Sequence, residues 1–127
     1  MIQSFDYDHS YFPAMPVVEV AIWHAPTLPE VALTAIVDSG ADITMVPVHY
    51  LQRIQARKSQ RAWLHGTAAT RRQIQLYIMS LRIGSYVQPN MRVVGDTQYD
   101  QMILGRDVLN HLIVTLNGLA GVVEISD

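Results

Sequence analysis

The sequence predicts an all-β fold, a small barrel or sandwich built as a single domain. Short runs rich in β-branched and aromatic residues recur along the chain, separated by turn residues such as Gly, Pro and Asn. The length of 127 residues fits one domain. Apolar residues make up 50% of the chain, which is enough to build a sizeable core.

The first strands are expected to begin at Pro16. Residues 16–24 and 30–38 are dense in Val, Ile and Ala, and the two prolines between them predict a turn. Residues 43–47 predict a short strand that follows a glycine-containing turn. Pro47 then opens a segment with weak helical spacing of its apolar residues, for which we expect a short helix or a loop.

The middle of the chain predicts a long hairpin. Its two strand-like arms, residues 61–65 and 71–83, surround the small residues 66–70, which suit a hairpin tip where backbone comes close to another group. The apolar residues of the second arm change parity near Met79 and Ser80. This switch predicts either a β-bulge, in which one extra residue turns the following side chains to the other face, or a bend where the strand leaves one layer for another.

The last part of the chain predicts three kinds of element. Strands are expected at residues 85–95, with a kink at Pro89, and in the short run 102–104. A glycine turn at 105 leads into one or two turns of helix ending near residue 112. Two closing strands, 112–116 and 121–125, are expected on either side of a glycine-containing turn.

The charge of the chain argues against nucleic acid as a partner. Nine Lys and Arg against eleven Asp and Glu leave a net charge of −2, without the basic excess of a phosphate-binding protein. Four of the cations gather locally at Arg53, Arg57, Lys58 and Arg61. We expect this cluster to be a solvated surface and assign it no function.

Composition excludes further classes. The absence of cysteine rules out disulfides, thiolate metal sites and thiol nucleophiles. No His-Glu-x-x-His motif is present, so we expect neither metal nor cofactor. The apolar runs are far shorter than the ~18 residues needed to cross a bilayer, and the polar, acidic start differs from a secretory signal. We therefore expect a cytoplasmic protein without a membrane partner.

The strongest chemical signal is a carboxylate at the end of an apolar strand. Ile36 and Val37 lead directly to Asp38, which a buried strand would hold rigidly. Ser39 can donate or accept a hydrogen bond, and Gly40 lets backbone amides approach the carboxylate without an intervening side chain. This pattern indicates a catalytic acid, although a strand-to-turn Asp with only a structural role is the plain alternative.

Residues 36–42, Ile-Val-Asp-Ser-Gly-Ala-Asp, and residues 103–109, Ile-Leu-Gly-Arg-Asp-Val-Leu, together resemble the two motifs of retropepsin-like aspartic proteases. The resemblance covers approximately residues 16–117. It implies an all-β, single-domain retropepsin-like closed barrel with a flap hairpin and one short C-terminal helix, forming a C2 dimer. The expected organisation is an N-terminal arm over residues 1–15 and a protease domain over residues 16–127.

An aspartic protease needs two carboxylates that share one proton. The ionised acid takes a proton from the attacking water, while the protonated acid polarises the scissile carbonyl. This chain has a single Asp-Ser-Gly, so the second acid is expected to be Asp38 of the partner subunit, in a homodimer with the active site on its two-fold axis. The activity implied is that of an aspartic endopeptidase acting on peptide or protein substrates.

The resemblance also implies roles for neighbouring residues. Ser39 is expected to form hydrogen bonds across the dimer axis and so to make the dyad rigid, and the Gly40 carbonyl is expected to accept a hydrogen bond from bound peptide. Asp42 is expected to contact peptide backbone and to form an ion pair with Arg106. We expect that pair to be bidentate and partly buried.

The hairpin lies where the family has its flap. Gly66, Thr67 and Ala68 are therefore expected to give backbone hydrogen bonds to a bound peptide. This tip has less glycine than the familiar flap. Trp63, close to it, is expected to pack in the core rather than to line the substrate pocket.

Two alternatives stay open. The chain could be a catalytically weak or inactive dimer that serves as a peptide-binding or scaffolding module. The dimer could be held by interleaved chain ends or by a longer sheet built on the C-terminal hairpin. A serine hydrolase that uses Ser39 is disfavoured because no Gly-x-Ser-x-Gly motif is present.

Overall fold

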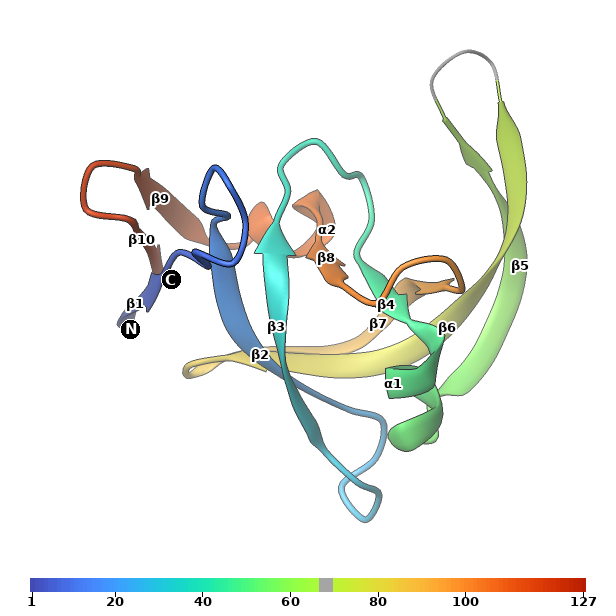
Figure 1. The fold of residues 1–127 in the computed structure, drawn as a ribbon. Coiled ribbons are helices and arrows are strands. Elements are labelled where there is room, and N and C mark those ends of the chain that lie inside the picture. Colours follow the sequence, from blue (N-terminus) through green and yellow to red (C-terminus); the bar gives the residue numbers. More distant parts are fainter. Residues whose placement is uncertain (67–69) are drawn as a thin grey trace.

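The structure, a computed structural model, describes residues 1–66 and 70–127 (Figure 1). Strands dominate it, and the helices are short. The elements in chain order are β1 (Ile2–Asp6), β2 (Val17–Trp23), β3 (Val31–Val37), β4 (Met45–Pro47), α1 (Val48–Arg53), β5 (Arg57–His65), β6 (Arg71–Ile83), β7 (Tyr86–Asp96), β8 (Met102–Leu104), α2 (Arg106–Leu109), β9 (Ile113–Asn117) and β10 (Val122–Ser126).

Six of the strands form a closed barrel. The main sheet has the order β2-β3-β8-β4-β7-β6-β5, and a further pairing of β2 with β6 closes the ring. β3 pairs with β8 and β4 with β7 in parallel, whereas the other pairs of the sheet are antiparallel. β5 stays outside the ring as a partner of β6, so these two strands form a long hairpin at one side of the barrel (Figure 1). The expected closed all-β barrel is confirmed.

The core fills the interior of the barrel. Alternate residues of β2, namely Val18, Val20 and Ile22, are buried because successive side chains of a strand point to opposite faces. The short helix α1 adds Leu51 to this core, and Ile54, the first residue after the helix, joins it. Both side chains are fully buried in the same apolar cluster. Each such side chain contributes roughly 1.5–3 kcal/mol by leaving water.

The segment after Pro47 is therefore a helix rather than a loop. Leu51 and Ile54 are three residues apart, which places both on the face of α1 that turns toward the barrel. The expectation of one short helix near the C-terminus is thus incomplete, because α1 accompanies α2. Neither helix of the described chain is long and apolar enough to cross a membrane.

Strand pairing is irregular near Met79, as expected, but the extra residue belongs to β7 and not to the second hairpin arm. Met79, Leu81 and Ile83 all face the core, so the expected change of face within β6 does not occur. The register between β6 and β7 shifts between Met79 and Leu81, where two residues of β7 face a single residue of β6. The Ser80 hydroxyl accepts a hydrogen bond from the Asn90 amide at 3.1 Å, and Asn90 has a φ of 51°. Pro89 occupies this irregular point, where its missing N–H removes no regular ladder bond.

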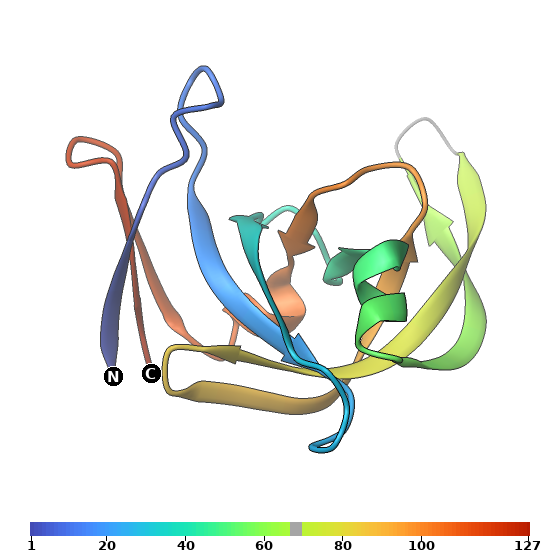
Figure 2. The same cartoon turned by 60° about the horizontal axis from the view of Figure 1, so that its bottom comes forward.

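The chain ends form a second, three-stranded sheet, of which the sequence predicts β9 and β10 but not β1. Its order is β1-β10-β9, so residues 2–6 of the expected arm are a strand paired with β10, and both termini lie side by side (Figure 2). Val123 and Ile125 of β10 are fully buried in the common core. β1 is mostly exposed and has no alternating apolar pattern, which explains why its sequence carries no strand signal.

Candidate active site

Asp38 stands at the point where two parallel strands end. β3 finishes at Val37, and the Asp38 amide donates a hydrogen bond to the carbonyl of Leu104, the last residue of β8, at 3.1 Å. Because parallel strands present their carboxyl ends at the same edge of a sheet, the residues after β3 and those after β8 meet. This pairing brings the two motifs, 36–42 and 103–109, together although more than sixty residues separate them.

The carboxylate of Asp38 is held by one backbone amide. The Gly40 amide donates a hydrogen bond to Asp38 Oδ1 at 2.9 Å. A Cβ on residue 40 would lie 3.1 Å from the same oxygen, so any larger residue would crowd the acid. The side chain of Asp38 is partly exposed, and no other described side chain donates a hydrogen bond to it. The acid is therefore rigid but accessible.

Gly105 allows the two motifs to touch. A Cβ on this residue would lie 2.8 Å from the carbonyl carbon of Ile43 and 3.0 Å from the carbonyl oxygen of Ala41. Both of these atoms belong to the backbone, which cannot move aside cheaply. The Arg106 amide donates a hydrogen bond to the same Ala41 oxygen at 2.9 Å, so the loop after Asp38 and the start of α2 are joined backbone to backbone.

The expected ion pair between Asp42 and Arg106 is present, but its geometry differs from the prediction. Asp42 Oδ1 receives only the Nη2 group of Arg106, because Nη1 donates to the Ser39 carbonyl at 2.6 Å. The Asp42 side chain is 85% exposed in this chain. The expectation of a bidentate, partly buried pair is wrong here, since the guanidinium bridges two loop positions at the surface. An exposed pair of this kind contributes about 0–1 kcal/mol.

A buried threonine is the residue that sequence reasoning missed. The Thr44 side chain is fully buried, and its hydroxyl donates a hydrogen bond to Asp107 Oδ1 at 2.7 Å. The Thr44 amide donates to the same carboxylate at 3.0 and 3.1 Å, while the Thr44 hydroxyl accepts from the Gly105 amide at 3.1 Å. A Thr shortly after one motif and an Asp within the other carry no spacing signal, so only the fold reveals this link.

The three acids in and around the two motifs therefore differ in their hydrogen-bond and ion-pair partners within the chain. Asp42 is paired with Arg106, and Asp107 is occupied by Thr44, whereas Asp38 has only a glycine amide. The Ser39 side chain is exposed, and its hydroxyl has no hydrogen-bond partner within the described residues. No group of three potential metal ligands exists in the part of the chain that the structure describes. Asp38 is thus the acid available for chemistry, and its role stays a prediction.

The long hairpin β5–β6 ends on the same side of the molecule as the loop after β3 (Figures 1 and 2). The Gly66 amide donates a hydrogen bond to the Thr70 carbonyl at 2.9 Å, which closes the described part of the hairpin. Gly66 is exposed. Thr67 and Ala68, expected to bind peptide, lie outside the described residues.

Trp63 does not pack in the core, contrary to expectation. Its side chain is 52% exposed, and the guanidinium carbon of Arg71 lies 4.5 Å from the centroid of its ring. The reason is topological, because β5 is the edge strand of the sheet and stands outside the closed ring. The indole therefore meets a cation of the neighbouring strand instead of the barrel interior.

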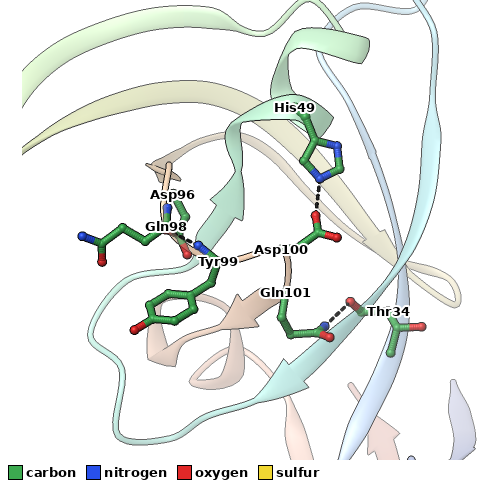
Figure 3. Close-up of polar contacts among 7 residues, drawn as sticks. All are labelled: Thr34, His49, Asp96, Gln98, Tyr99, Asp100 and Gln101. Carbon is green, nitrogen blue, oxygen red and sulfur yellow. Dashed lines mark hydrogen bonds and ion pairs between the residues drawn. The ribbon is translucent and has the colours of Figure 1, made fainter.

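The loop 97–101, which leads into the second motif, is tied at both ends (Figure 3). Asp96 is buried at the end of β7 and accepts hydrogen bonds from two backbone amides of the loop at 2.9 and 3.3 Å. Asp100 contacts the His49 imidazole of α1, and the Gln101 side chain donates to a carbonyl of β3 at 2.9 Å. These contacts fix how β8 enters the site.

Comparisons with known proteins point in one direction. A family model described as "gag-polyprotein putative aspartyl protease" matches residues 27–111. The structure of EIAV protease complexed with the inhibitor HBY-793 is similar with a TM-score of 0.61 and 20% identity, over 76% of this chain and 86% of that chain. The crystal structure of a retropepsin-like aspartic protease from Rickettsia conorii is similar with a TM-score of 0.67 and 13% identity, over 98% of this chain and 91% of that chain. The curated proteins contain no match to this chain.

Proposed function

Since this chain belongs to the family of retropepsin-like aspartic proteases, we propose that it is an aspartic endopeptidase that works as a homodimer. The observation that carries the proposal is the state of Asp38. It lies at the meeting point of both motifs, is held by the Gly40 amide and is otherwise available. The second acid of the dyad is Asp38 of the partner subunit, placed by a two-fold axis.

The chemistry divides between the two acids. The ionised carboxylate takes a proton from a water molecule as the water oxygen attacks the scissile carbonyl carbon. The protonated carboxylate donates a hydrogen bond to the carbonyl oxygen and stabilises the charge that develops there. Proton transfer to the amide nitrogen then releases the two peptide fragments. No metal or cofactor takes part in this scheme.

Neighbouring groups position the substrate. The exposed Ser39 hydroxyl is free to reach across the dimer axis, which would hold the two loops in register. The Gly40 carbonyl and the exposed Asp42 carboxylate bind peptide backbone, while Arg106 holds the loop between them from the side of α2. The hairpin β5–β6 covers the bound peptide and excludes water, which strengthens the electrostatic interactions inside the site.

The three-stranded sheet β1-β10-β9 is the proposed contact surface of the dimer. β9 has a strand partner on one side only, within the described chain, so its other edge offers unpaired backbone groups. Ile113 and Leu116 of β9 are 64% and 54% exposed, and Leu119 in the following turn is fully exposed. Ile113 and Leu116 flank this edge on opposite faces of the sheet, because side chains alternate along a strand. An unpaired strand edge with exposed apolar side chains beside it is suited to pairing with another chain.

Peptide hydrolysis across pH 3–7 tests the proposed function, with Asp38→Asn as the control. We expect a bell-shaped dependence of the rate on pH, since one acid must be ionised and the other protonated, and loss of all activity in the variant. Tight peptide binding without cleavage by the wild-type protein would instead assign the fold to a peptide-binding module.

A further inference from the structure

The charges of this chain are segregated. Residues 43–95 contain eight Arg and Lys but no Asp or Glu, whereas all eleven acids lie outside this range. A net charge of −2 hides this division. The hairpin β5–β6 lies within the basic segment, so the element proposed to cover the substrate is strongly cationic.

The fold brings three of these cations to one cavity. Lys58 and Arg61 of β5 and Arg72 of β6 line a cavity of about 480 Å³ between the hairpin, α1 and the end of β7. This volume falls within the range of about 300–1,000 Å³ typical of ligand pockets. Arg72 comes from the opposite arm of the hairpin, so the set is assembled by strand pairing and not by sequence proximity alone.

None of the three cations has an ion-pair partner among the described residues, and no carboxylate lines the cavity. Arg82 pairs with Glu30 and Arg106 pairs with Asp42, whereas the other four arginines of the chain likewise have no ion-pair partner among the described residues. What sets Lys58, Arg61 and Arg72 apart is that they line one cavity. Gathering like charges around one space costs electrostatic free energy when the space is empty, and an anion that enters it recovers that free energy.

The remaining lining suits a carboxylate. Gln52 and Gln73 add side-chain amide groups, and Tyr77 adds apolar surface. A third glutamine of the lining, Gln75, uses its amide nitrogen for the carbonyls of Ser59 and Leu76, at 2.9 and 3.0 Å. The Tyr77 ring packs against the backbone of Gly95, where a Cβ would lie only 2.4 Å from ring atom Cε1. A carboxylate could thus meet guanidinium and amide donors above an apolar base.

We propose that this cavity binds an acidic side chain of the peptide substrate, and so makes the enzyme selective for sequences with Asp or Glu at one fixed distance from the scissile bond. The inference rests on the proposed function, because it takes the hairpin to cover the bound peptide. A peptide is favoured over nucleic acid because the cations surround one small cavity and the rest of the chain is acidic.

Cleavage of a random decapeptide library, read by mass spectrometry, tests the proposal. We expect Asp or Glu to be enriched at one position among the peptides that the wild-type protein cuts. For a matched pair of substrates with Glu or Gln at that position, kcat/KM is expected to differ about fivefold, as for a partly solvated charge pair. The difference should shrink in high salt.

Variants separate the cavity from the general charge of the protein. The triple variant Lys58→Gln, Arg61→Gln, Arg72→Gln is expected to lose the preference for Glu over Gln while it still cleaves the Gln peptide. Arg92→Gln removes an exposed cation of β7 outside the cavity and is expected to keep the preference. Thermal unfolding of each variant checks that the barrel is intact.

The outcomes distinguish the two proposals. Cleavage without an acidic preference, or a preference unchanged in the triple variant, overturns the cavity inference and leaves the proposed function standing. If the wild-type protein cuts nothing, the proposed function fails, and the cavity is judged by retention of the same peptides on immobilised protein at low salt. The cavity inference is supported if the wild-type protein retains acidic peptides and the triple variant does not. Equal retention by the triple variant, or tighter binding of a single-stranded oligonucleotide, overturns it.

Discussion

At the scale of single residues, the site depends on close backbone approach at Gly105. The loop that follows Asp38 and the first residue of α2 are joined by a backbone hydrogen bond at 2.9 Å, which leaves no room for a side chain between them. A glycine here is a packing requirement, and it does not depend on an unusual backbone conformation. The same requirement keeps the loop after Asp38 in position relative to β8.

Replacing Gly105 by alanine is expected to lower the free energy of unfolding by about 1–3 kcal/mol, because the new Cβ would meet backbone atoms of Ile43 and Ala41 at 2.8 and 3.0 Å. Urea denaturation measures the change. Gly118→Ala is the matched control, since a Cβ there meets nothing within 4 Å, and it should leave stability almost unchanged. Equal stability of both variants would show that the loops are not packed as described.

Thr44 links the two motifs through its hydroxyl, so Thr44→Val is expected to cost about 1–3 kcal/mol of stability. The variant loses the hydrogen bond from the hydroxyl to Asp107 and leaves the Gly105 amide without its acceptor, while the amide of residue 44 still donates to Asp107. Thr44→Ser keeps the hydroxyl and should recover most of the loss. Thr115→Val on the exposed edge of β9 serves as the control. If Val and Ser at position 44 had the same effect, the hydroxyl would carry no part of the stability.

At the scale of elements, strand order decides which side chains are buried. β5 and β6 form one hairpin, yet the second half of β6 lies in the closed ring and is buried, while β5 stays at the edge and is largely exposed. Trp63 is accordingly a surface residue. The apolar residues of β5 stand together at 62–64, whereas those of β6 extend from Ile74 to Ile83, and only the pairing of β2 with β6 shows which of the two strands joins the ring.

Tyr86, at the start of β7, gives a pH dependence to the stability. Burial raises the pKa of its phenol above the ordinary value of 10.0. The folded state therefore holds the phenol proton more tightly than the unfolded state does. The stabilisation is present below pH 10.0 and is lost as the pH rises through the higher folded-state pKa.

Tyr86→Phe removes this titration together with a hydrogen bond of 2.8 Å from the hydroxyl to Gln88. Near neutral pH the variant is expected to be less stable by about 1 kcal/mol. That deficit should narrow above the ordinary tyrosine pKa, as urea unfolding at several alkaline pH values would show. Tyr99→Phe, at an exposed site, is the control and should show a constant difference. A deficit that widens with pH would contradict the expected direction.

At the scale of the whole molecule, one chain supplies a single unpaired acid at the meeting point of its motifs. The proposed reaction needs two such acids, so activity is tied to self-association. The sheet of the chain ends offers the edge strand β9 for that contact. The charge segregation is a second molecular feature, because Asp38 lies in the acidic part of the chain and the hairpin β5–β6 lies in the basic part.

Leu116→Asp is expected to weaken self-association by at least about tenfold, since it places a charge on the apolar edge of β9. Sedimentation velocity at several concentrations measures the change, and peptide hydrolysis should fall with it. Tyr99→Asp alters an exposed residue of the loop 97–101, which contacts α1 and β3 instead of this sheet, and is the control. Unchanged dimerisation of the Leu116 variant would place the interface on another surface.

The sequence by itself determined the strands of the barrel and the two motifs, 36–42 and 103–109. These features depend on local alternation and on short motifs, which are legible one segment at a time. Only the tertiary structure decided that β1 pairs with β10, that Thr44 holds Asp107, and that cations of two strands share a cavity. Such contacts depend on which distant segments pair. Strands pair through backbone groups, which every residue has, so the sequence carries no pattern that identifies the partner strand.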